Sequence, residues 1–379
     1  MSAPQGQRIA ILRERAAGET RVSATPETVR KLVALGAAVA VEQGAGMAAS
    51  LFDEDYRAAG AEVGKAETVL ARADIVLGVQ GPDPALLSDT KPGAWVVATL
   101  DPFSQRTRVE AYAAAGLEAL AMEFMPRITR AQSMDVLSSQ SNLAGYKAVI
   151  AAADIYGRAF PMMMTAAGTI SAAKCFVMGV GVAGLQAIAT ARRLGAQVSA
   201  TDVRSATKEQ ILSLGAKPIF VENVAGIEGE GSGGYATEMS EEYQKAQAEL
   251  VSSHIAKQDI VITTALIPGR AAPRLISDAQ IATMKPGSVI FDLAAPQGGN
   301  VEGTVADQVV ERHGVKIIGY SNTPANLPAD ASALYARNLF NFLSAFWDKD
   351  QGKPVLDEEI GDAIRLTRDG SVVNARLLG

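Results

Sequence analysis

The sequence predicts an α/β protein made of two doubly wound Rossmann-like domains joined by long helices. Short apolar runs typical of buried strands alternate with helical patterns, which is the order of a parallel sheet covered by helices. The runs form two series, separated by a proline-free stretch at 137–160. The chain has 379 residues. Since a typical domain holds roughly 100 to 200 residues, two domains are expected.

Five apolar runs predict the strands of the first domain: 9–12, 38–42, 74–77, 95–98 and 120–123. After the first run, Thr25 and Pro26 predict the start of a helix, with Thr25 as the N-cap. Proline suits the first helical position because an N–H there would have no acceptor inside the helix, so its absence costs no hydrogen bond.

Six further runs predict the strands of the second domain: 175–178, 198–201, 218–221, 260–263, 289–292 and 315–318. A long helix at 137–160 leads into this domain, because apolar residues there recur at steps of three and four. The spacing of Tyr335, Leu339 and Phe342 predicts a second long helix, capped at Asp330, that returns the chain to the first domain. The expected domains are therefore 1–136 with 329–379, and 137–328.

Composition excludes several classes of function. The net charge is −6 and no dense basic run occurs, so nucleic acid is not expected as a partner. The single cysteine, Cys175, lies in an apolar run and is expected to be a buried small hydrophobe. We expect no export signal and no metal site. We also expect no membrane span, because the most apolar stretch, 175–191, is shorter than the ~20 residues that a span needs.

A phosphate-binding loop is predicted at 179–184. The run 175–178 leads into Gly179, Gly181 and Gly184, and a helical pattern follows, so the GxGxxG motif has the strand–turn–helix context that a dinucleotide site requires. The first glycine permits the tight turn, the second lets backbone N–H groups approach the pyrophosphate, and the third allows close packing of helix on strand.

Asp202 follows the next predicted strand, where a carboxylate can accept hydrogen bonds from the ribose hydroxyls of NAD(H). Arg204 lies two residues further on and could instead neutralise a 2′-phosphate. The carboxylate favours NAD(H), because a 2′-phosphate would meet a like charge there.

Conventional acid–base residues are scarce. The two histidines, His254 in a polar helix and His313 in a helix-end pattern, are both expected at the surface. The densest polar cluster is 127–142, whose arginines, amides and hydroxyls suit recognition of a carboxamide and a ribose. A helix cap in a solvated loop explains it equally well. A glycine-rich loop at 222–234 is either a flexible insertion or a lid over a ligand.

The sequence resembles the alanine dehydrogenase and pyridine nucleotide transhydrogenase family, and within it the NAD(H)-binding domain I of the proton-translocating transhydrogenases. The likeness covers nearly the whole chain. The stretches that carry it are Met125-Pro-Arg-Ile-Thr-Arg-Ala-Gln-Ser-Met-Asp135, Leu137-Ser-Ser-Gln-Ser-Asn-Leu-Ala-Gly-Tyr146, Met162-Met-Met-Thr-Ala-Ala-Gly168, Gly179-Val-Gly-Val-Ala-Gly-Leu-Gln-Ala-Ile-Ala189 and Ile262-Thr-Thr-Ala-Leu-Ile-Pro-Gly269.

The resemblance assigns roles to residues of this chain. The nicotinamide and its ribose would contact Arg127, Gln132, Ser133, Asp135 and Ser138, with Gln132, Arg127 and Asp135 closest to catalysis. The pyrophosphate and adenosine side would contact Val182, Asp202, Val203 and Arg204, with Ala265 and Leu266 nearby. The family's lid matches Gly234, Tyr235, Ala236 and Met239, and Gln247 is a weaker match, so the resemblance favours a lid.

The alanine dehydrogenase branch carries a lysine after its third strand and a histidine after its fourth. Here those places read Leu77-Gly78-Val79 and Thr99-Leu100-Asp101, although the arginine after the first strand is retained as Arg21. Amino-acid oxidation then lacks an evident proton carrier, whereas hydride transfer between two nicotinamides needs none.

The resemblance therefore implies a transhydrogenase subunit that binds NAD(H), while NADP(H) is bound by a partner beta subunit. It also implies a membrane alpha-2 subunit, a homodimer, and a cytoplasmic location, peripheral on the cytoplasmic face of the inner membrane. The alternatives are an amino- or imino-acid dehydrogenase of the same family and a non-catalytic NAD-sensing module.

Overall fold

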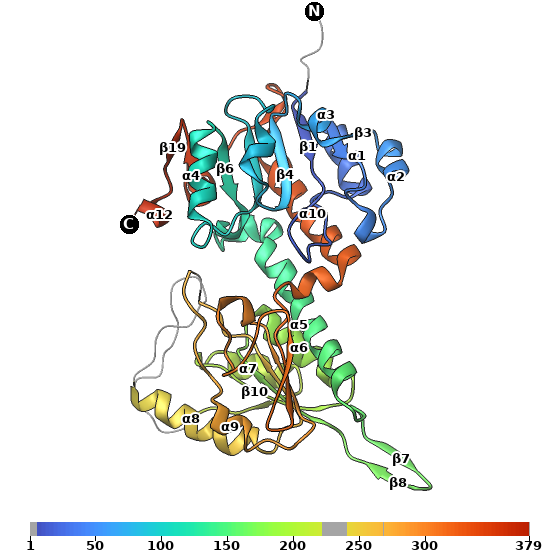
Figure 1. Cartoon of the computed structure of the whole chain (residues 1–379), viewed down its shortest axis with the longest axis vertical. Coiled ribbons are helices and arrows are strands. Elements are labelled where there is room, and N and C mark those ends of the chain that lie inside the picture. Colours follow the sequence, from blue (N-terminus) through green and yellow to red (C-terminus); the bar gives the residue numbers. More distant parts are fainter. Residues whose placement is uncertain (1–5, 222–240, 268, 379) are drawn as a thin grey trace, which may run out of the picture. The chain divides into compact units, whose positions relative to one another are not determined.

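The computed structural model describes residues 6–221, 241–267 and 269–378, and the chain forms two compact units (Figure 1). Unit 1 contains residues 1–140 and 325–379, and unit 2 contains residues 141–324. The sequence prediction places these two boundaries after 136 and after 328.

Unit 1 is built on a six-stranded parallel sheet of order β3-β2-β1-β4-β5-β6. The strands are β1 Arg8–Ile11, β2 Ala38–Glu42, β3 Glu62–Gly64, β4 Ile75–Gln80, β5 Trp95–Thr99 and β6 Glu118–Ala121. Ile9 pairs with Val39 on one side and with Ile75 on the other, so the chain changes direction across the sheet at β1. This is the doubly wound order that the sequence predicts.

The helices of unit 1 are α1 Pro26–Ala34, α2 Asp53–Ala58, α3 Ala66–Leu70, α4 Arg106–Ala114, α10 Pro328–Ala345, α11 Glu358–Ile364 and α12 Ala375–Leu378. The predicted start of α1 is confirmed: the side chain of Thr25 accepts the N–H of Thr28, and the Thr28 hydroxyl accepts the N–H of Thr25. The predicted cap of α10 is wrong, because that helix begins at Pro328 and Asp330 lies inside its first turn.

Two two-stranded ribbons complete unit 1: β16 Trp347–Asp348 with β17 Lys353–Pro354, and β18 Thr367–Arg368 with β19 Ser371–Val372.

Unit 2 is built on a seven-stranded sheet of order β11-β10-β9-β12-β13-β15-β14, in which the edge strand β14 runs antiparallel to β15. Its strands are β9 Lys174–Met178, β10 Gln197–Thr201, β11 Lys217–Pro218, β12 Ile260–Thr263, β13 Val289–Asp292, β14 Val309–Arg312 and β15 Val315–Ile318. Its helices are α6 Val182–Arg193, α7 Thr207–Ser213, α8 Glu241–Ile255 and α9 Asp278–Ile281, and it shares α5 Val136–Ile155 with unit 1. Cys175 is fully buried, as predicted.

Local details differ from the sequence prediction in unit 2. The helix end expected around His313 is instead the turn of the β14–β15 hairpin, because His313 and Gly314 have φ of 52° and 75°. Two successive left-handed residues suit the right-handed twist of a two-residue hairpin. The strand expected at 218–221 stops at Pro218, at the sheet edge where proline is tolerated.

The sequence analysis does not predict a hairpin that the structure shows within 162–170. β7 Met163–Thr165 pairs with β8 Gly168–Ile170, and all six of these residues are exposed. Met162 and Met164 are 61% and 76% exposed. Figure 1 shows the hairpin extending from unit 2 beyond α5.

Within the part of the chain that the structure describes, no helix is long and apolar enough to cross a membrane.

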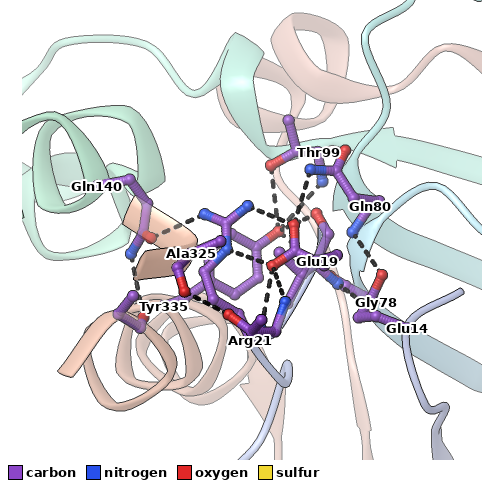
Figure 2. A network of polar contacts seen from close by, with 12 residues as sticks. Glu14, Glu19, Arg21, Gly78, Gln80, Thr99, Gln140, Ala325 and Tyr335 are labelled. Carbon is purple, nitrogen blue, oxygen red and sulfur yellow. Dashed lines mark hydrogen bonds and ion pairs between the residues drawn. The ribbon is translucent and has the colours of Figure 1, made fainter. Parts of the chain in front are cut away.

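A buried polar network joins the strand ends of unit 1 (Figure 2). The register of β4 against β5 shifts between Leu77 and Gln80. The Tyr335 hydroxyl from α10 occupies this irregularity: it accepts the N–H of Thr99 at 3.1 Å and lies 3.1 Å from the carbonyl oxygen of Val79. Glu14 accepts the N–H of Val79 at 2.6 Å. Side chains thus replace ladder hydrogen bonds that the irregularity removes.

Arg21 holds the second part of this network. Its Nε and Nη2 donate to the two oxygens of Glu19 at 2.7 and 2.6 Å, and its Nη1 donates to Gln140 of α5 at 2.8 Å (Figure 2). Thr20 donates its hydroxyl to the carbonyl of Ala325. Burial alone would raise the pKa of Glu19, but Arg21 outweighs it and lowers that pKa to about 2. Thr20 and Arg21, which follow β1, therefore bind the two residues of unit 1 at which the chain leaves it and returns, Gln140 and Ala325.

Two other buried carboxyls behave in the opposite way. Burial raises the pKa of Glu14 and of Glu123 to about 7, although each accepts backbone N–H groups. Between their ordinary value of 4.5 and about 7, the folded protein keeps protons that the unfolded chain has lost. The free energy of unfolding therefore decreases as pH rises through this window.

We predict that Glu123→Gln removes part of this pH dependence, because glutamine cannot ionise and its carbonyl can keep both backbone hydrogen bonds. Relative to the unsubstituted chain, the variant should gain up to about 3 kcal/mol between about pH 5 and about pH 8. Urea unfolding across this range measures the effect. Substitution of the exposed Glu67 by Gln serves as the control. If the free energy of unfolding of Glu123→Gln changed with pH in the same way as that of the unsubstituted chain, the prediction would be contradicted.

Candidate functional site

The glycine turn of unit 2 has the geometry that the sequence predicts. β9 ends at Met178, and α6 begins at Val182 with Gly181 as its N-cap. Gly179 has φ of +98°, a backbone conformation that residues other than glycine rarely adopt. Its N–H donates to the carbonyl of Thr201 at 2.9 Å, so the turn is attached to the end of the neighbouring strand β10.

The three glycines have three different physical roles. A Cβ on Gly184 would lie 1.9 Å from the carbonyl oxygen of Gly179, so only glycine allows α6 to start this close to β9. A Cβ on Gly179 would lie 2.5 Å from the Thr264 hydroxyl. Among the residues that the structure describes, a Cβ on Gly181 would meet nothing within 4 Å. The open space at Gly181, in front of a helix N-terminus, fits the close approach of a pyrophosphate.

Asp202 lies directly after β10, beside the turn. Its carboxylate accepts the N–H of Val180 at 2.7 Å and three hydrogen bonds from Arg204: from the backbone N–H, Nε and Nη2, each at 2.9 Å. Burial alone would raise the pKa of Asp202, but the hydrogen bonds from Arg204 and Val180 hold it below its ordinary value. An ionised carboxylate therefore stands where the sequence predicts a ribose ligand.

The loop after β12 forms the other side of the turn, since β9 and β12 are neighbours in the sheet. The Thr264 hydroxyl donates to the carbonyl of Gly179 at 3.1 Å. Asn300, which is fully buried, holds the next residue of the loop: it accepts the N–H of Ala265 at 3.1 Å and donates to its carbonyl at 2.9 Å. Leu266 remains 39% exposed at the end of this segment.

The predicted residues therefore divide between the two units. Unit 2 brings together, at the carboxyl ends of β9, β10 and β12, the residues predicted for the pyrophosphate and adenosine side: Gly179, Gly181, Val182, Gly184, Asp202, Val203, Arg204, Ala265 and Leu266. Unit 1 carries Arg127, Gln132, Ser133, Asp135 and Ser138. Gln247 lies on α8 and is partly exposed. Gly234, Tyr235, Ala236 and Met239 lie outside the described residues.

In unit 1, Asp135 stands immediately before α5. Its carboxylate accepts both the N–H and the hydroxyl of Ser138, at 2.9 and 2.6 Å, so the interpretation of this stretch as a helix cap is correct for these two residues. The side chains of Arg127 and Gln132 are exposed. Capping fixes Asp135 and Ser138 at the start of a long helix, which is also a rigid place from which to present polar groups to a ligand.

Other residues stand at the strand ends where the resemblance led us to look for the lysine and histidine of the alanine dehydrogenase branch. β4 continues to Gln80, whose amide donates to Glu19, and the N–H of Leu100 beyond β5 donates to Glu123 (Figure 2 shows the former). Both histidines lie in unit 2. His313 is exposed as predicted, but His254 is half-buried, with its ring against Phe176 and its Nε2 at 2.8 Å from the Ser199 hydroxyl.

Two residues that shape the site are not predicted individually: Thr264 and Asn300. Thr264 lies within a stretch that carries the family resemblance, 262–269, but its contact with Gly179 depends on the neighbouring positions of β9 and β12. Asn300 follows two glycines at the start of a loop, and no local pattern indicates that its side chain reaches a residue 35 positions earlier in the chain.

Two family models match the chain, the alanine dehydrogenase/PNT N-terminal domain over residues 10–144 and the C-terminal domain over residues 148–375. The chain belongs to the alanine dehydrogenase/PNT family. The predicted family and fold class are thereby confirmed.

Within this family the chain is more similar to transhydrogenase alpha subunits than to alanine dehydrogenases. It is 53% identical to the first part of NAD(P) transhydrogenase subunit alpha of Rhodospirillum rubrum, over 98% of this chain and 99% of that protein. It is 29% identical to alanine dehydrogenase 1 of Staphylococcus aureus, over 93% and 90% of the two chains. The crystal structure of transhydrogenase from Sinorhizobium meliloti matches with a TM-score of 0.85 and 50% identity, over 97% and 99% of the chains.

We predict opposite outcomes for alanine at two glycines of this turn. Gly181→Ala should leave the free energy of unfolding nearly unchanged, because its Cβ enters open space, but should weaken NADH binding at least tenfold. Gly184→Ala should destabilise the chain by about 1 to 3 kcal/mol, because its Cβ overlaps the Gly179 carbonyl. Urea unfolding and NADH fluorescence titration measure the two effects. Unchanged NADH affinity in a folded Gly181→Ala would contradict the assignment of the turn.

Proposed function

We propose that this chain is the NAD(H)-binding component of a proton-translocating NAD(P) transhydrogenase. The observation that carries the proposal is the glycine turn of unit 2, with open space at Gly181 and an ionised Asp202 beside it. The similarity to the first part of a transhydrogenase alpha subunit, over nearly the full length of both chains, supports the choice among NAD-dependent activities.

The residues of unit 2 would hold the cofactor. The N–H groups at the start of α6 would donate to the pyrophosphate, and Asp202 would accept hydrogen bonds from the adenosine ribose. Because Arg204 pairs with Asp202, its charge is already compensated and attracts a 2′-phosphate less strongly, which favours NAD(H) over NADP(H). In unit 1, Arg127, Gln132, Ser133, Asp135 and Ser138 would contact the nicotinamide and its ribose.

When bound, NADH would supply a hydride directly to NADP⁺ held by a partner subunit. A hydride carries both electrons, so the exchange between two nicotinamides releases no proton and no side chain has to carry one. The chain's own residues then contribute by orienting the cofactor and excluding water, and catalysis depends on positioning. The absence of lysine and histidine at the strand ends after β4 and β5 agrees with this requirement.

A second candidate is an amino-acid dehydrogenase, which would need a proton carrier. Glu14 and Glu123, with their pKa raised to about 7, are groups in unit 1 that could transfer a proton at neutral pH. Both accept backbone N–H groups of their own unit, which favours a structural role. Formation of NADH from NAD and alanine by the chain alone would establish this candidate instead.

The partners belong to the same proposal. Such an alpha component would act with an NADP(H)-binding beta subunit and a membrane alpha-2 subunit, docked at the cytoplasmic face of the inner membrane. We further propose that the chain is a homodimer, with the β7–β8 hairpin packed against the second copy. An isolated hairpin is marginally stable in water, and a partner would cover the exposed methionines of this one.

The functional proposal predicts that the chain, mixed with an NADP(H)-binding partner subunit, catalyses NADH-dependent reduction of NADP⁺. Gln132→Asn should slow this reaction at least tenfold while leaving NADH affinity within about twofold, because it shortens a positioning side chain. Stopped-flow absorbance and NADH titration separate the two effects. The exposed Gln105→Asn is the control. Retained NADH binding without any turnover by the unsubstituted chain would indicate a sensor instead.

The dimer proposal predicts that Met164→Asp shifts the chain from dimer to monomer without changing its thermal unfolding in the monomeric state. A charge on the most exposed methionine of the hairpin would have to be buried in the interface, which is costly. Sedimentation at several concentrations measures the change. A monomeric unsubstituted chain, or a variant that dimerises equally well, would remove the hairpin from the interface.

A further inference from the structure

The loop after β12 is held in place by an asparagine from a different strand end. Asn300 lies beyond β13 and is fully buried. Its side-chain oxygen accepts the N–H of Ala265, and its nitrogen donates to the carbonyls of Ala265 and of Pro273, at 2.9 and 2.8 Å. Both backbone groups of Ala265 therefore pair with one amide side chain, which fixes the orientation of that peptide segment.

The held segment adjoins the phosphate turn. Thr264, one residue before Ala265, is paired with β9, since its N–H donates to the carbonyl of Met178 at 2.9 Å. Its hydroxyl donates to Gly179. Leu266, one residue after Ala265, is a large apolar side chain left 39% exposed. The segment 264–266 thus lies beside the glycine turn, at the carboxyl ends of the neighbouring strands β9 and β12, where ligands of doubly wound folds bind.

Asn300 is itself fixed by a second buried group. Asp292, at the end of β13, accepts the N–H of Val301, the residue after Asn300, at 3.0 Å and the N–H of Ala294 at 3.0 Å. The carbonyl of Asn300 accepts the N–H of Leu275 at 2.7 Å. The backbone that carries the amide is therefore itself hydrogen-bonded, and the amide's three hydrogen bonds hold Ala265 and Pro273 in the observed conformation.

We propose that Asn300 is a positioning residue for NAD(H), which acts through the peptide segment at Ala265 and sets the positions of Thr264 and Leu266 before the cofactor binds. This inference rests on the proposed function of unit 2 as an NAD(H) site. Because Asn300 is fully buried, it would act on the cofactor only through this segment. Its contribution is preorganisation, because a loop already in its bound conformation loses less conformational entropy when the ligand arrives.

Substitution of the amide tests the proposal. Asn300→Asp keeps the size and can still accept from Ala265, but places a carboxylate oxygen against the two carbonyls. Asn300→Ala removes all three hydrogen bonds. Both variants should raise the Kd for NADH at least tenfold. Thr304→Val is the matched control, because it removes a nearby hydrogen bond to Asp292 but leaves the bond from Val301 to Asp292 and the three bonds of the Asn300 amide in place. Its Tm should fall comparably, while its Kd for NADH should stay within twofold.

The binding measurements use the full purified chain and NADH alone. If the unsubstituted chain fails to bind NADH, the proposed function fails. If it binds and a folded Asn300→Asp or Asn300→Ala binds equally well, the inference about Asn300 fails on its own. An equal loss of affinity in Thr304→Val would also overturn it, since general destabilisation would then explain the effect.

Hydrogen exchange of the unsubstituted chain provides a test that does not depend on folding of the variants. The amide of Ala265 should be protected before NADH is added, because Asn300 already accepts it. Free exchange of that amide without NADH, followed by protection on binding, would show that the cofactor rather than Asn300 orders the segment and would overturn the proposal.

Discussion

The contact between Gly184 and the carbonyl of Gly179 determines the rest of the site in unit 2. A Cβ at Gly184 would approach that oxygen to 1.9 Å, so α6 can start beside the end of β9 only because this residue is glycine. This close start places the N-terminus of the helix directly after the carboxyl end of β9. Asp202 and Thr264 then fix the two flanks of the turn through Val180 and Gly179.

In unit 1 a comparable constraint comes from the buried pair of Arg21 and Glu19. Breaking such a pair leaves an uncompensated charge in the interior, which typically costs about 3 to 5 kcal/mol. The pair is useful structurally because its remaining donor reaches Gln140, where α5 leaves the unit. The neighbouring Thr20 binds Ala325, where the chain returns. In this chain Arg21 therefore holds the backbone of unit 1 together.

The parts of the fold set by local pattern can be predicted from the sequence. Strands with β-branched residues in short buried runs, such as β12 and β13, match the predicted bounds, and the Thr25 cap is local chemistry between residues three apart. The prediction at His313 and Gly314 is wrong because a histidine before glycine also ends helices, and the antiparallel pairing of β14 with β15 decides between the two. The β7–β8 hairpin escapes prediction because all its paired residues are exposed, so no alternation marks it.

The same division applies to the site. Gly179, Gly181, Gly184 and Asp202 follow from spacing along the chain, because the turn and the next strand end are consecutive in the fold. Asn300 does not, because its partners Ala265 and Pro273 are brought to it only when β12 and β13 pair. A ligand pocket at a switch point is lined by several strand ends that are distant in sequence. Motifs therefore indicate the glycine turn that we propose binds the phosphates, whereas the contacts of Asn300 can be found only once the strands are paired.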